Sequence, residues 1–225
     1  LRRHLAPKPL AGRRVLVTAG PTREPLDPVR FLSNRSSGKM GYALAEAAAE
    51  LGAEVTLVSG PTALAAPIGM ETLRVETAEE MAAAVRARVP GSDLFIGCAA
   101  VSDHRPAEAQ GEKRKGKDPF RLELVPNPDI LAEVAALPEG PATLAFAAET
   151  GDAVARARDK RTAKGADWVA VNDVTEAGAG FGADTNRVVL LGPEGEEALP
   201  LAGKRAVARA LLSRLAAALG ARSGG

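Results

Sequence analysis

Short apolar segments typical of buried strands alternate along this chain with segments that carry helix signals. Val15–Val17, Glu54–Ser59 and Leu94–Cys98 are segments of the first kind, and the last is apolar along its whole length. A strand without polar positions is buried on both faces, as in a parallel sheet that helices cover on each side. The alternation therefore predicts an α/β protein with a doubly wound, mainly parallel sheet and helices on both faces.

Capping signals and turn residues place the remaining elements. Thr77 begins a capping box with Glu80, and Asn127 is expected to cap a helix whose first position is Pro128. The other expected helices are Tyr42–Leu51, Gly151–Lys164 and Lys204–Leu219. Further strands are expected at Leu73–Val75, Phe120–Leu124, Thr143–Phe146 and Trp168–Val171, and a terminal hairpin at Arg187–Leu191 and Glu197–Leu201. Residues 1–12, basic and containing prolines, predict a linker or tail, and residues 13–225 a single domain.

The composition excludes several classes of protein. The chain has 225 residues with 29 basic and 28 acidic side chains, so the net charge of +1 argues against a broad nucleic-acid or membrane surface. Cys98 is the only cysteine and His4 and His104 are the only histidines, which argues against a disulfide framework and a metal centre built from these residues. No apolar run is long enough to cross a bilayer. A cytoplasmic protein is expected.

Polar residues that suit phosphate follow the first predicted strand. Ser36, Ser37 and Gly38 precede a predicted helix, whose N-terminus offers N–H groups and a positive dipole end to an anion. Serine capping of the helix explains the same residues equally well. Neither the glycine fingerprint of dinucleotide-binding proteins nor the P-loop spacing is present.

Charged residues follow two later strands. Asp103, after Leu94–Cys98, can meet a magnesium ion or a ligand hydroxyl, although a turn explains it too. The basic loop Glu112–Lys117 can close over a polyphosphate, but a solvated loop is the commoner explanation for such a run. Lys160 and Lys164 share one helical face, where an anion or plain solvent can accommodate them.

Longer motifs resemble one enzyme family. The motifs are Thr18–Glu24, Asp27–Arg30, Ser33–Gly41, Ala99–Asp103, Glu112–Lys113, Asn127–Ile130, Phe146–Thr150 and Asn172–Val174 followed by Gly180–Phe181. In this order they resemble phosphopantothenate–cysteine ligase of the bacterial type, and the resemblance runs from about Gly12 to the last helix. It implies a Rossmann-like fold and the joining of 4′-phosphopantothenate to L-cysteine, with CTP consumed, CMP and diphosphate released, and an acyl-cytidylate as intermediate.

The resemblance also implies cofactors and partners. Mg²⁺ (or Mn²⁺) is expected, and no FMN is expected on this domain. In the family the ligase is usually fused to a flavin-dependent phosphopantothenoylcysteine decarboxylase. This chain would be the ligase half of such a protein, without the decarboxylase half. A homodimer is expected, with Gly178–Asp184 and the terminal hairpin helping to build the interface.

Roles carry over by motif. Asn34, Lys113 and Arg30 would be catalytic: Asn34 would stabilise the acyl-cytidylate, Arg30 would contact the phosphopantothenate, and Lys113 would cover the triphosphate. The expected nucleotide-binding residues are Ala99, Ala100, Val101, Asp103, Lys113, Asn127, Pro128, Asp129, Ile130, Phe146, Lys160 and Lys164. The expected phosphate- and substrate-binding residues are Gly20, Thr22, Arg30, Asn34, Ser36, Ser37 and Gly38. The metal ligands are not identified. The family's lysine loop often continues differently after Lys113, so the phosphate contacts of the later basic residues stay open.

Alternative functions remain at this point. Eukaryotic relatives use ATP, and the residues alone do not decide between CTP and ATP. An NAD(P)-dependent oxidoreductase is disfavoured by the missing glycine fingerprint. A non-catalytic nucleotide-binding module is disfavoured by Asn34 and Lys113.

Overall fold

The computed structural model describes residues 8–116, 118–173, 175–176 and 182–222. An eight-stranded sheet forms its centre, with the strand order β12-β11-β10-β9-β6-β1-β4-β5. Pairing from β5 to β10 is parallel, and β11 and β12 extend the sheet as an antiparallel hairpin. The bounds are β1 Arg14–Ala19, β4 Glu54–Ser59, β5 Glu71–Arg74, β6 Leu94–Gly97, β9 Ala142–Glu149, β10 Trp168–Asp173, β11 Thr185–Gly192 and β12 Gly195–Gly203.

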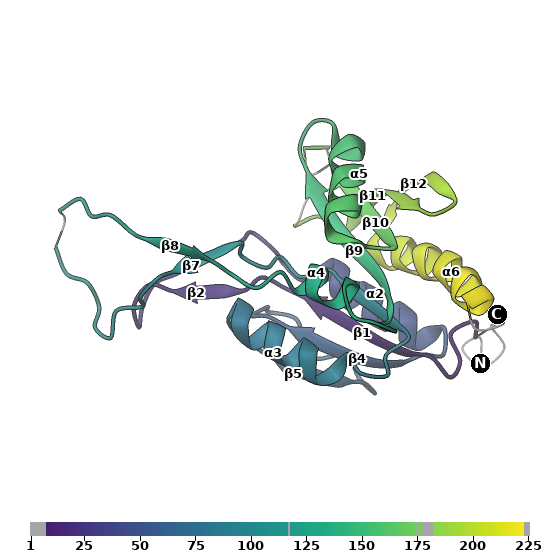
Figure 1. Cartoon of the computed structure of the whole chain (residues 1–225), viewed down its shortest axis with the longest axis horizontal. Coiled ribbons are helices and arrows are strands. Elements are labelled where there is room, and N and C mark those ends of the chain that lie inside the picture. Colours follow the sequence, from purple (N-terminus) through teal and green to yellow (C-terminus); the bar gives the residue numbers. More distant parts are fainter. Residues whose placement is uncertain (1–7, 117, 174, 177–181, 223–225) are drawn as a thin grey trace.

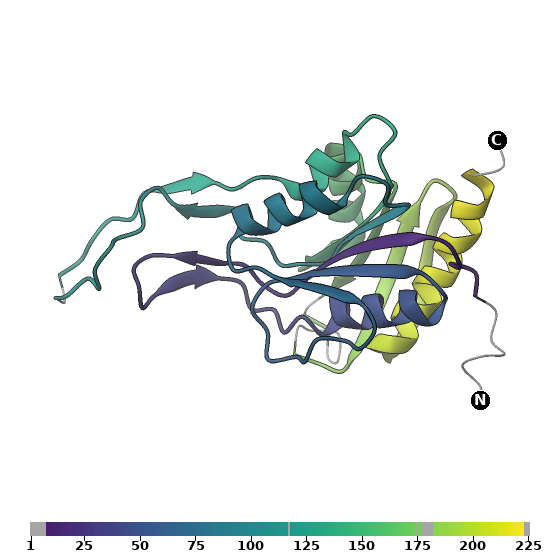
Figure 2. The ribbon, with the colours of Figure 1, turned by 90° about the horizontal axis from the view of Figure 1, so that it is seen from below.

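Helices cover both faces of this sheet, as the sequence predicts (Figures 1 and 2). One face carries α2 (Lys39–Glu50) and α6 (Lys204–Arg222), and the other carries α3 (Ala78–Arg88), α4 (Ile130–Ala135) and α5 (Ala153–Lys164). Successive strand residues point to opposite faces. In β1, Val15 and Val17 join the core under α2 and α6, whereas Leu16 joins the core under α3 and α4. Burial on both sides explains the apolar strands.

A two-layered arm projects from the body (Figures 1 and 2). Two short antiparallel ribbons begin it, β2 (Arg23–Pro25) with β3 (Phe31–Ser33) and β7 (His104–Pro106) with β8 (Leu124–Pro126). We call residues 23–33 and 104–126 the arm. A backbone hydrogen bond of 2.9 Å from the Gln110 N–H to the Leu26 carbonyl joins the two ribbons. The ion pair of Asp27 with Arg30 joins them too, because both of its side chains contact the backbone of Arg114.

Three sequence predictions differ from the structure. The expected strand Phe120–Leu124 overlaps a strand only at Leu124, because the chain pairs with β7 rather than with the main sheet. Asp129, not Asn127, caps α4, because the Asn127 Oδ1 oxygen that a cap would use accepts instead from the Arg105 guanidinium over 3.2 Å, while its Nδ2 group donates to the Ser102 carbonyl over 2.8 Å. Leu10 belongs to the expected linker but is fully buried, and its N–H donates to the Leu51 carbonyl. Packing of the domain therefore extends to Leu10 at least.

Among the described residues, no helix is long and apolar enough to span a bilayer.

Candidate active site

A cavity of about 650 Å³ lies over the carboxyl ends of the central strands. The chain leaves β1 toward β4 on one side and returns later to β6 on the other side, so the strand order reverses between β1 and β6. Ligands of open α/β sheets bind in the crevice at such a reversal. Its lining comes from the carboxyl ends of β1, β9 and β10, from the end of β6 and the segment after it, and from the starts of α2 and α4 with the residues before them. Residues of α5, β11 and α6 complete it.

The first turn of α2 presents backbone donors to this cavity. Gly38 is the N-cap in a left-handed conformation (φ 76°), and among the described residues no side-chain cap hydrogen bond is found at this position. The Ser36 hydroxyl accepts a 3.3 Å hydrogen bond from the Gly38 N–H rather than from the helix itself. Because the first turn also holds no acidic residue, the positive end of the helix dipole stays available to an anion. Within the described part of the chain, the N-cap of α2 is Gly38 and not a serine, which is the alternative explanation for this motif.

Asn34 lines the same cavity with its amide fixed in one orientation. Its Nδ2 group donates to the Ala100 carbonyl over 3.1 Å and to the Val101 carbonyl over 3.2 Å. Both N–H donors are therefore used, and the Oδ1 oxygen is the group left for a ligand. An amide can contact an anionic species there without adding charge.

The segment after β8 forms the opposite wall. Besides its side-chain bond to Ser102, Asn127 donates its N–H to the Asp103 carbonyl over 2.9 Å, so Asn127 and Asp103 are tied together. Asp129 caps α4 and forms an ion pair with Lys164 of α5. These contacts bring two segments distant in sequence and α5 to one edge of the cavity.

The cavity lining carries a net positive charge. Five basic and three acidic side chains contribute, which leaves an excess of two. They are Arg35, Lys39, Lys160, Lys164 and Lys204 against Asp103, Asp129 and Glu149. Such a lining suits a ligand with several negative charges.

Most of the residues predicted from the sequence are brought together here. The lining includes Asn34, Ser36, Ser37, Gly38, Ala99, Ala100, Val101, Asp103, Asn127, Pro128, Asp129, Ile130, Phe146, Lys160 and Lys164.

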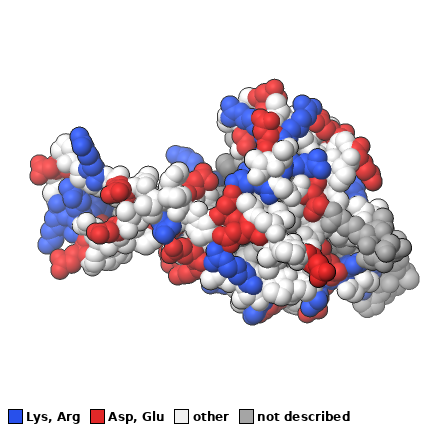
Figure 3. Space-filling view, viewed as in Figure 1, with Lys and Arg blue, Asp and Glu red and all other residues white. Residues whose placement is uncertain are grey.

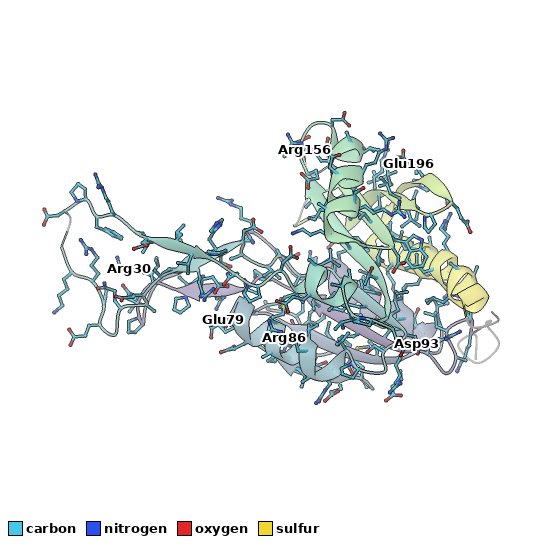
Figure 4. The ribbon with its side chains drawn as sticks, viewed as in Figure 1. Arg30, Glu79, Arg86, Asp93, Arg156 and Glu196 are labelled. Carbon is cyan, nitrogen blue, oxygen red and sulfur yellow. The ribbon has the colours of Figure 1, made fainter. Side chains whose placement is uncertain are left out.

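Four predicted residues do not line the cavity. Thr22 is fully buried and its hydroxyl accepts from the Ser102 N–H, so it holds the loop after β6 in place. Gly20 has φ 75°, and its carbonyl accepts from the Ala100 N–H over 2.8 Å. Arg30 and Lys113 lie on the arm, where Figure 4 shows Arg30 well away from the helices of the body. Lys and Arg side chains gather at the far end of the arm (Figure 3).

Sequence reasoning missed several cavity residues. Lys39 and Asn172 belong to motifs quoted above, so their presence there could have indicated them. Asn186 and Lys204 stand in no motif, and no signal in the sequence marks them. Cys98 also lines the cavity, and burial raises the pKa of its thiol to about 12. A thiol that stays neutral is a poor nucleophile.

The cavity fits magnesium only together with a ligand. Among the described residues, no three His, Cys, Asp or Glu side chains gather as a possible metal site. Mg²⁺ is commonly held by one or two carboxylates plus substrate phosphates, and Asp103 offers one exposed carboxylate at the cavity. The donor set therefore fits Mg²⁺ bound with a polyphosphate.

Comparisons with known proteins identify relatives of this chain. The chain is similar to the coenzyme A biosynthesis bifunctional protein CoaBC of Vibrio cholerae, with 51% identity over 211 residues that cover 92% of this chain and 53% of that protein. CoaBC of Escherichia coli K12 is 48% identical over 206 residues, 89% of this chain and 51% of that protein. The chain thus spans about half the length of the curated relatives it matches.

Solved structures show the same fold. The crystal structure of the C-terminal domain of CoaBC superposes with a TM-score of 0.81 at 40% identity, covering 95% of this chain and 98% of that domain. A Cab2 mutant in complex with phosphopantothenate-cysteine has a TM-score of 0.74 at 17% identity, covering 95% of this chain and 89% of that one, and shows the likeness of fold.

Fold and site together define a Rossmann-like α/β protein with a crevice of net positive lining at the reversal of its sheet. More particularly, the family described as "DNA/pantothenate metabolism flavoprotein C-terminal domain" matches residues 10–219, and the chain belongs to that family.

Proposed function

We propose that this chain joins 4′-phosphopantothenate to L-cysteine in coenzyme A biosynthesis, consuming CTP and releasing CMP and diphosphate through an acyl-cytidylate. The observation that carries the proposal is Asn34, whose amide is locked by two backbone carbonyls beside the uncapped start of α2. Membership of the pantothenate metabolism family and the CoaBC relatives support the choice of reaction.

The first step would bring two anions together. The carboxylate of phosphopantothenate attacks the α-phosphorus of the nucleotide, and diphosphate leaves. The excess of basic side chains, Lys160 among them, and the positive end of α2 would offset the repulsion. Mg²⁺ held by Asp103 and phosphate oxygens supplies further neutralisation of the leaving diphosphate when it is bound.

The second step needs a mixed anhydride that survives until the amine arrives. The Oδ1 oxygen of Asn34 would accept a hydrogen bond from the pantothenoyl part while the two carbonyl contacts keep the amide from turning. The amine nitrogen then bonds to the acyl carbon and loses a proton, the bond from that carbon to the phosphate oxygen breaks, and CMP departs with the electron pair and takes up that proton. Exclusion of water from the cavity would protect the anhydride.

A homodimer is part of the proposal. Several large apolar side chains are exposed on the arm, and their contact with water is unfavourable. They are Val29, Phe31, Phe120, Leu122 and Leu124. Packing of the arm against a second copy would cover them, and would let Arg30 and Lys113 act at the cavity of that copy. The sequence predicts the interface at Gly178–Asp184 and the hairpin β11–β12, whereas the exposed apolar side chains favour the arm. Gly178–Phe181 of the expected interface lie outside the described residues.

We also propose a partner domain. Because this chain spans about half of its bifunctional relatives, the remaining half would be the flavin-dependent decarboxylase, and this domain would bind no FMN itself.

The test is diphosphate release from 4′-phosphopantothenate and Mg²⁺, with CTP or ATP, and with or without cysteine. CTP-dependent release that rises with cysteine is the expected result. Release with ATP only would keep the ligation and overturn the choice of nucleotide. No release with either nucleotide would leave a nucleotide-binding module.

A further inference from the structure

An arginine outside the cavity contacts the wall that begins where β8 ends. The wall consists of residues 127–130, which all line the cavity. Arg105 is the middle residue of β7, two positions after Asp103, and the described residues that line the cavity do not include it. It pairs with Val125 of β8, so its backbone lies two residues away from the start of the wall.

The Arg105 guanidinium holds both the end of β8 and the first residue of the wall. Its Nη1 group donates to the Pro126 carbonyl over 2.7 Å and to the Asn127 Oδ1 oxygen over 3.2 Å. The other end of the amide, Nδ2, donates to the Ser102 carbonyl over 2.8 Å. Because the amide oxygen faces a donor and the amide nitrogen faces an acceptor, these contacts favour a single orientation of the Asn127 side chain.

Glu79 fixes the guanidinium from another element. Its Oε1 oxygen forms an ion pair with the Arg105 Nη2 group over 2.9 Å, so acceptors on two elements hold the planar fork. Glu79 lies in the first turn of α3, at the end of that helix nearest the arm (Figure 4). The buried carboxylate of Glu24 accepts from the Ala78 N–H over 3.1 Å and anchors this turn. Arg105 therefore connects an anchored helix start to the wall of the cavity.

Asn127 passes this constraint on to polar groups of the cavity. Its N–H donates to the carbonyl of Asp103, whose exposed carboxylate suits Mg²⁺ bound with phosphate. Two residues after Asn127, Asp129 forms its ion pair with Lys164. Of the three proposed substrates only the nucleotide carries a polyphosphate, since phosphopantothenate has a single phosphate and cysteine has none. A displaced wall should therefore weaken the binding of CTP first.

We propose that Arg105 is a positioning residue for nucleotide binding. With Glu79 behind it, Arg105 orients Asn127 and keeps Asp103 and Asp129 in place for the nucleotide with its Mg²⁺, while it touches no ligand itself. A binding group misplaced by about 1 Å can cost about 100-fold in rate, so a residue outside the cavity can have a large effect. The inference rests on the proposed function and deepens it.

The alternative is that Arg105 only stabilises the fold, and the chain offers a matched control for that role. Arg86 of α3 pairs with Glu133 of α4 through two hydrogen bonds of 2.9 and 3.0 Å, and neither residue is among those that line the cavity in the described part of the chain. Figure 4 labels Arg86 on the same helix as Glu79. Loss of Arg86 therefore removes a comparable ion pair of α3 without touching the wall.

Steady-state kinetics, with CTP and cysteine varied separately, test the proposal. Arg105→Met should raise the KM for CTP at least tenfold and change the KM for cysteine less than twofold. Arg86→Met should leave both KM values within twofold of the unaltered protein. Arg105→Lys should recover part of the loss, because its ammonium can still donate to the Pro126 carbonyl or to the Asn127 oxygen.

A double-mutant cycle shows whether Arg105 acts through Asn127. Asn127→Ala should also raise the KM for CTP. If the two residues act as one unit, the variant with both substitutions should raise this KM by clearly less than the product of the two single effects. Urea denaturation of Arg105→Met and Arg86→Met compares their losses of stability, so that a change in KM is not confused with partial unfolding.

If Arg105→Met does not fold, Glu79→Gln replaces it, because this change removes the ion pair and keeps the guanidinium. It should raise the KM for CTP about threefold, and Arg105→Lys should do the same.

Three outcomes would overturn the positioning role. The first is an unchanged KM for CTP in Arg105→Met or, if that variant does not fold, in Glu79→Gln and Arg105→Lys. The second is an equal rise in the KM for cysteine or in the KM for CTP of Arg86→Met, which would leave Arg105 a structural residue. The third is a double variant whose effect equals the product of the single effects. Failure of the proposed function would look different, since the unaltered protein would release no diphosphate; calorimetric titration with CTP and Mg²⁺ would then still compare binding by the same variants.

Discussion

The start of α2 depends on a glycine whose replacement has a calculable cost. Gly38 has φ 76°, and a Cβ atom added there would lie 2.7 Å from the Thr62 Cγ2 atom. The left-handed conformation costs an L-residue about 1–2 kcal/mol. An overlap of this kind in packed surroundings adds about 1–3 kcal/mol. Gly38→Ala should therefore lower the free energy of unfolding by about 2–5 kcal/mol.

Gly69 supplies the matched control. Its φ is 80°, but nothing lies within 4 Å of the Cβ position, so Gly69→Ala should cost only the conformational part, about 1–2 kcal/mol. Thr62→Ser removes the Cγ2 methyl and keeps the hydroxyl that contacts the Tyr42 hydroxyl. In the Gly38→Ala background, Thr62→Ser should restore the free energy of unfolding to that of Gly69→Ala, because it removes the overlap.

Urea denaturation of Gly38→Ala, Gly69→Ala, Thr62→Ser, the double variant Gly38→Ala/Thr62→Ser and the unaltered protein measures these free energies of unfolding. The rate of diphosphate release, measured on the same proteins, reports on the active site. Gly38→Ala should slow diphosphate release, because the shift that relieves the overlap moves the donors at the start of α2. The reasoning is refuted if Gly38→Ala is no less stable than Gly69→Ala, or if Thr62→Ser recovers nothing.

Three further predictions follow from the site and the arm. Asn34→Asp should lower turnover by roughly 100-fold, because it removes the amide donors and adds charge next to the anhydride; normal turnover would contradict the role of Asn34. Phe31→Asp, on the exposed surface of the arm, should shift sedimentation from dimer to monomer, and an unchanged sedimentation coefficient would exclude the arm as the interface. The Arg30 guanidinium holds the pKa of the Asp27 carboxyl well below its usual range. The ion pair therefore contributes its stability above about pH 4 and loses it as the pH falls further, through the folded pKa. Carboxyl chemical shifts of Asp27 should not titrate near pH 4, and should do so in Arg30→Gln.

The sequence by itself determined the sheet and most of the cavity lining. Buried strands such as Val15–Val17 are recognisable because burial on both faces demands apolar residues at every position. Residues that follow such strands must reach the same edge of a parallel sheet, and this is why Asp103, Ser36 and Phe146 were placed together correctly.

Tertiary structure decided what local patterns do not encode. Asn127 has the residue type of a cap, but its side-chain oxygen accepts from Arg105 of another segment, and Asp129 caps α4 instead. Phe120 lies outside any strand, since the chain around it has left the sheet to form the arm.

The cavity residues missed by sequence reasoning have the same origin. Lys204 and Asn186 become neighbours of the cavity only because the hairpin β11–β12 extends the sheet antiparallel to β10 and returns α6 against α2. Arg30 and Lys113 stand in recognisable motifs, yet within one chain the arm carries them away from the cavity. Sequence pattern fixes which residues are buried in strands, because that requirement is local. Which polar side chains meet depends on long-range pairing, and only the folded chain determines it.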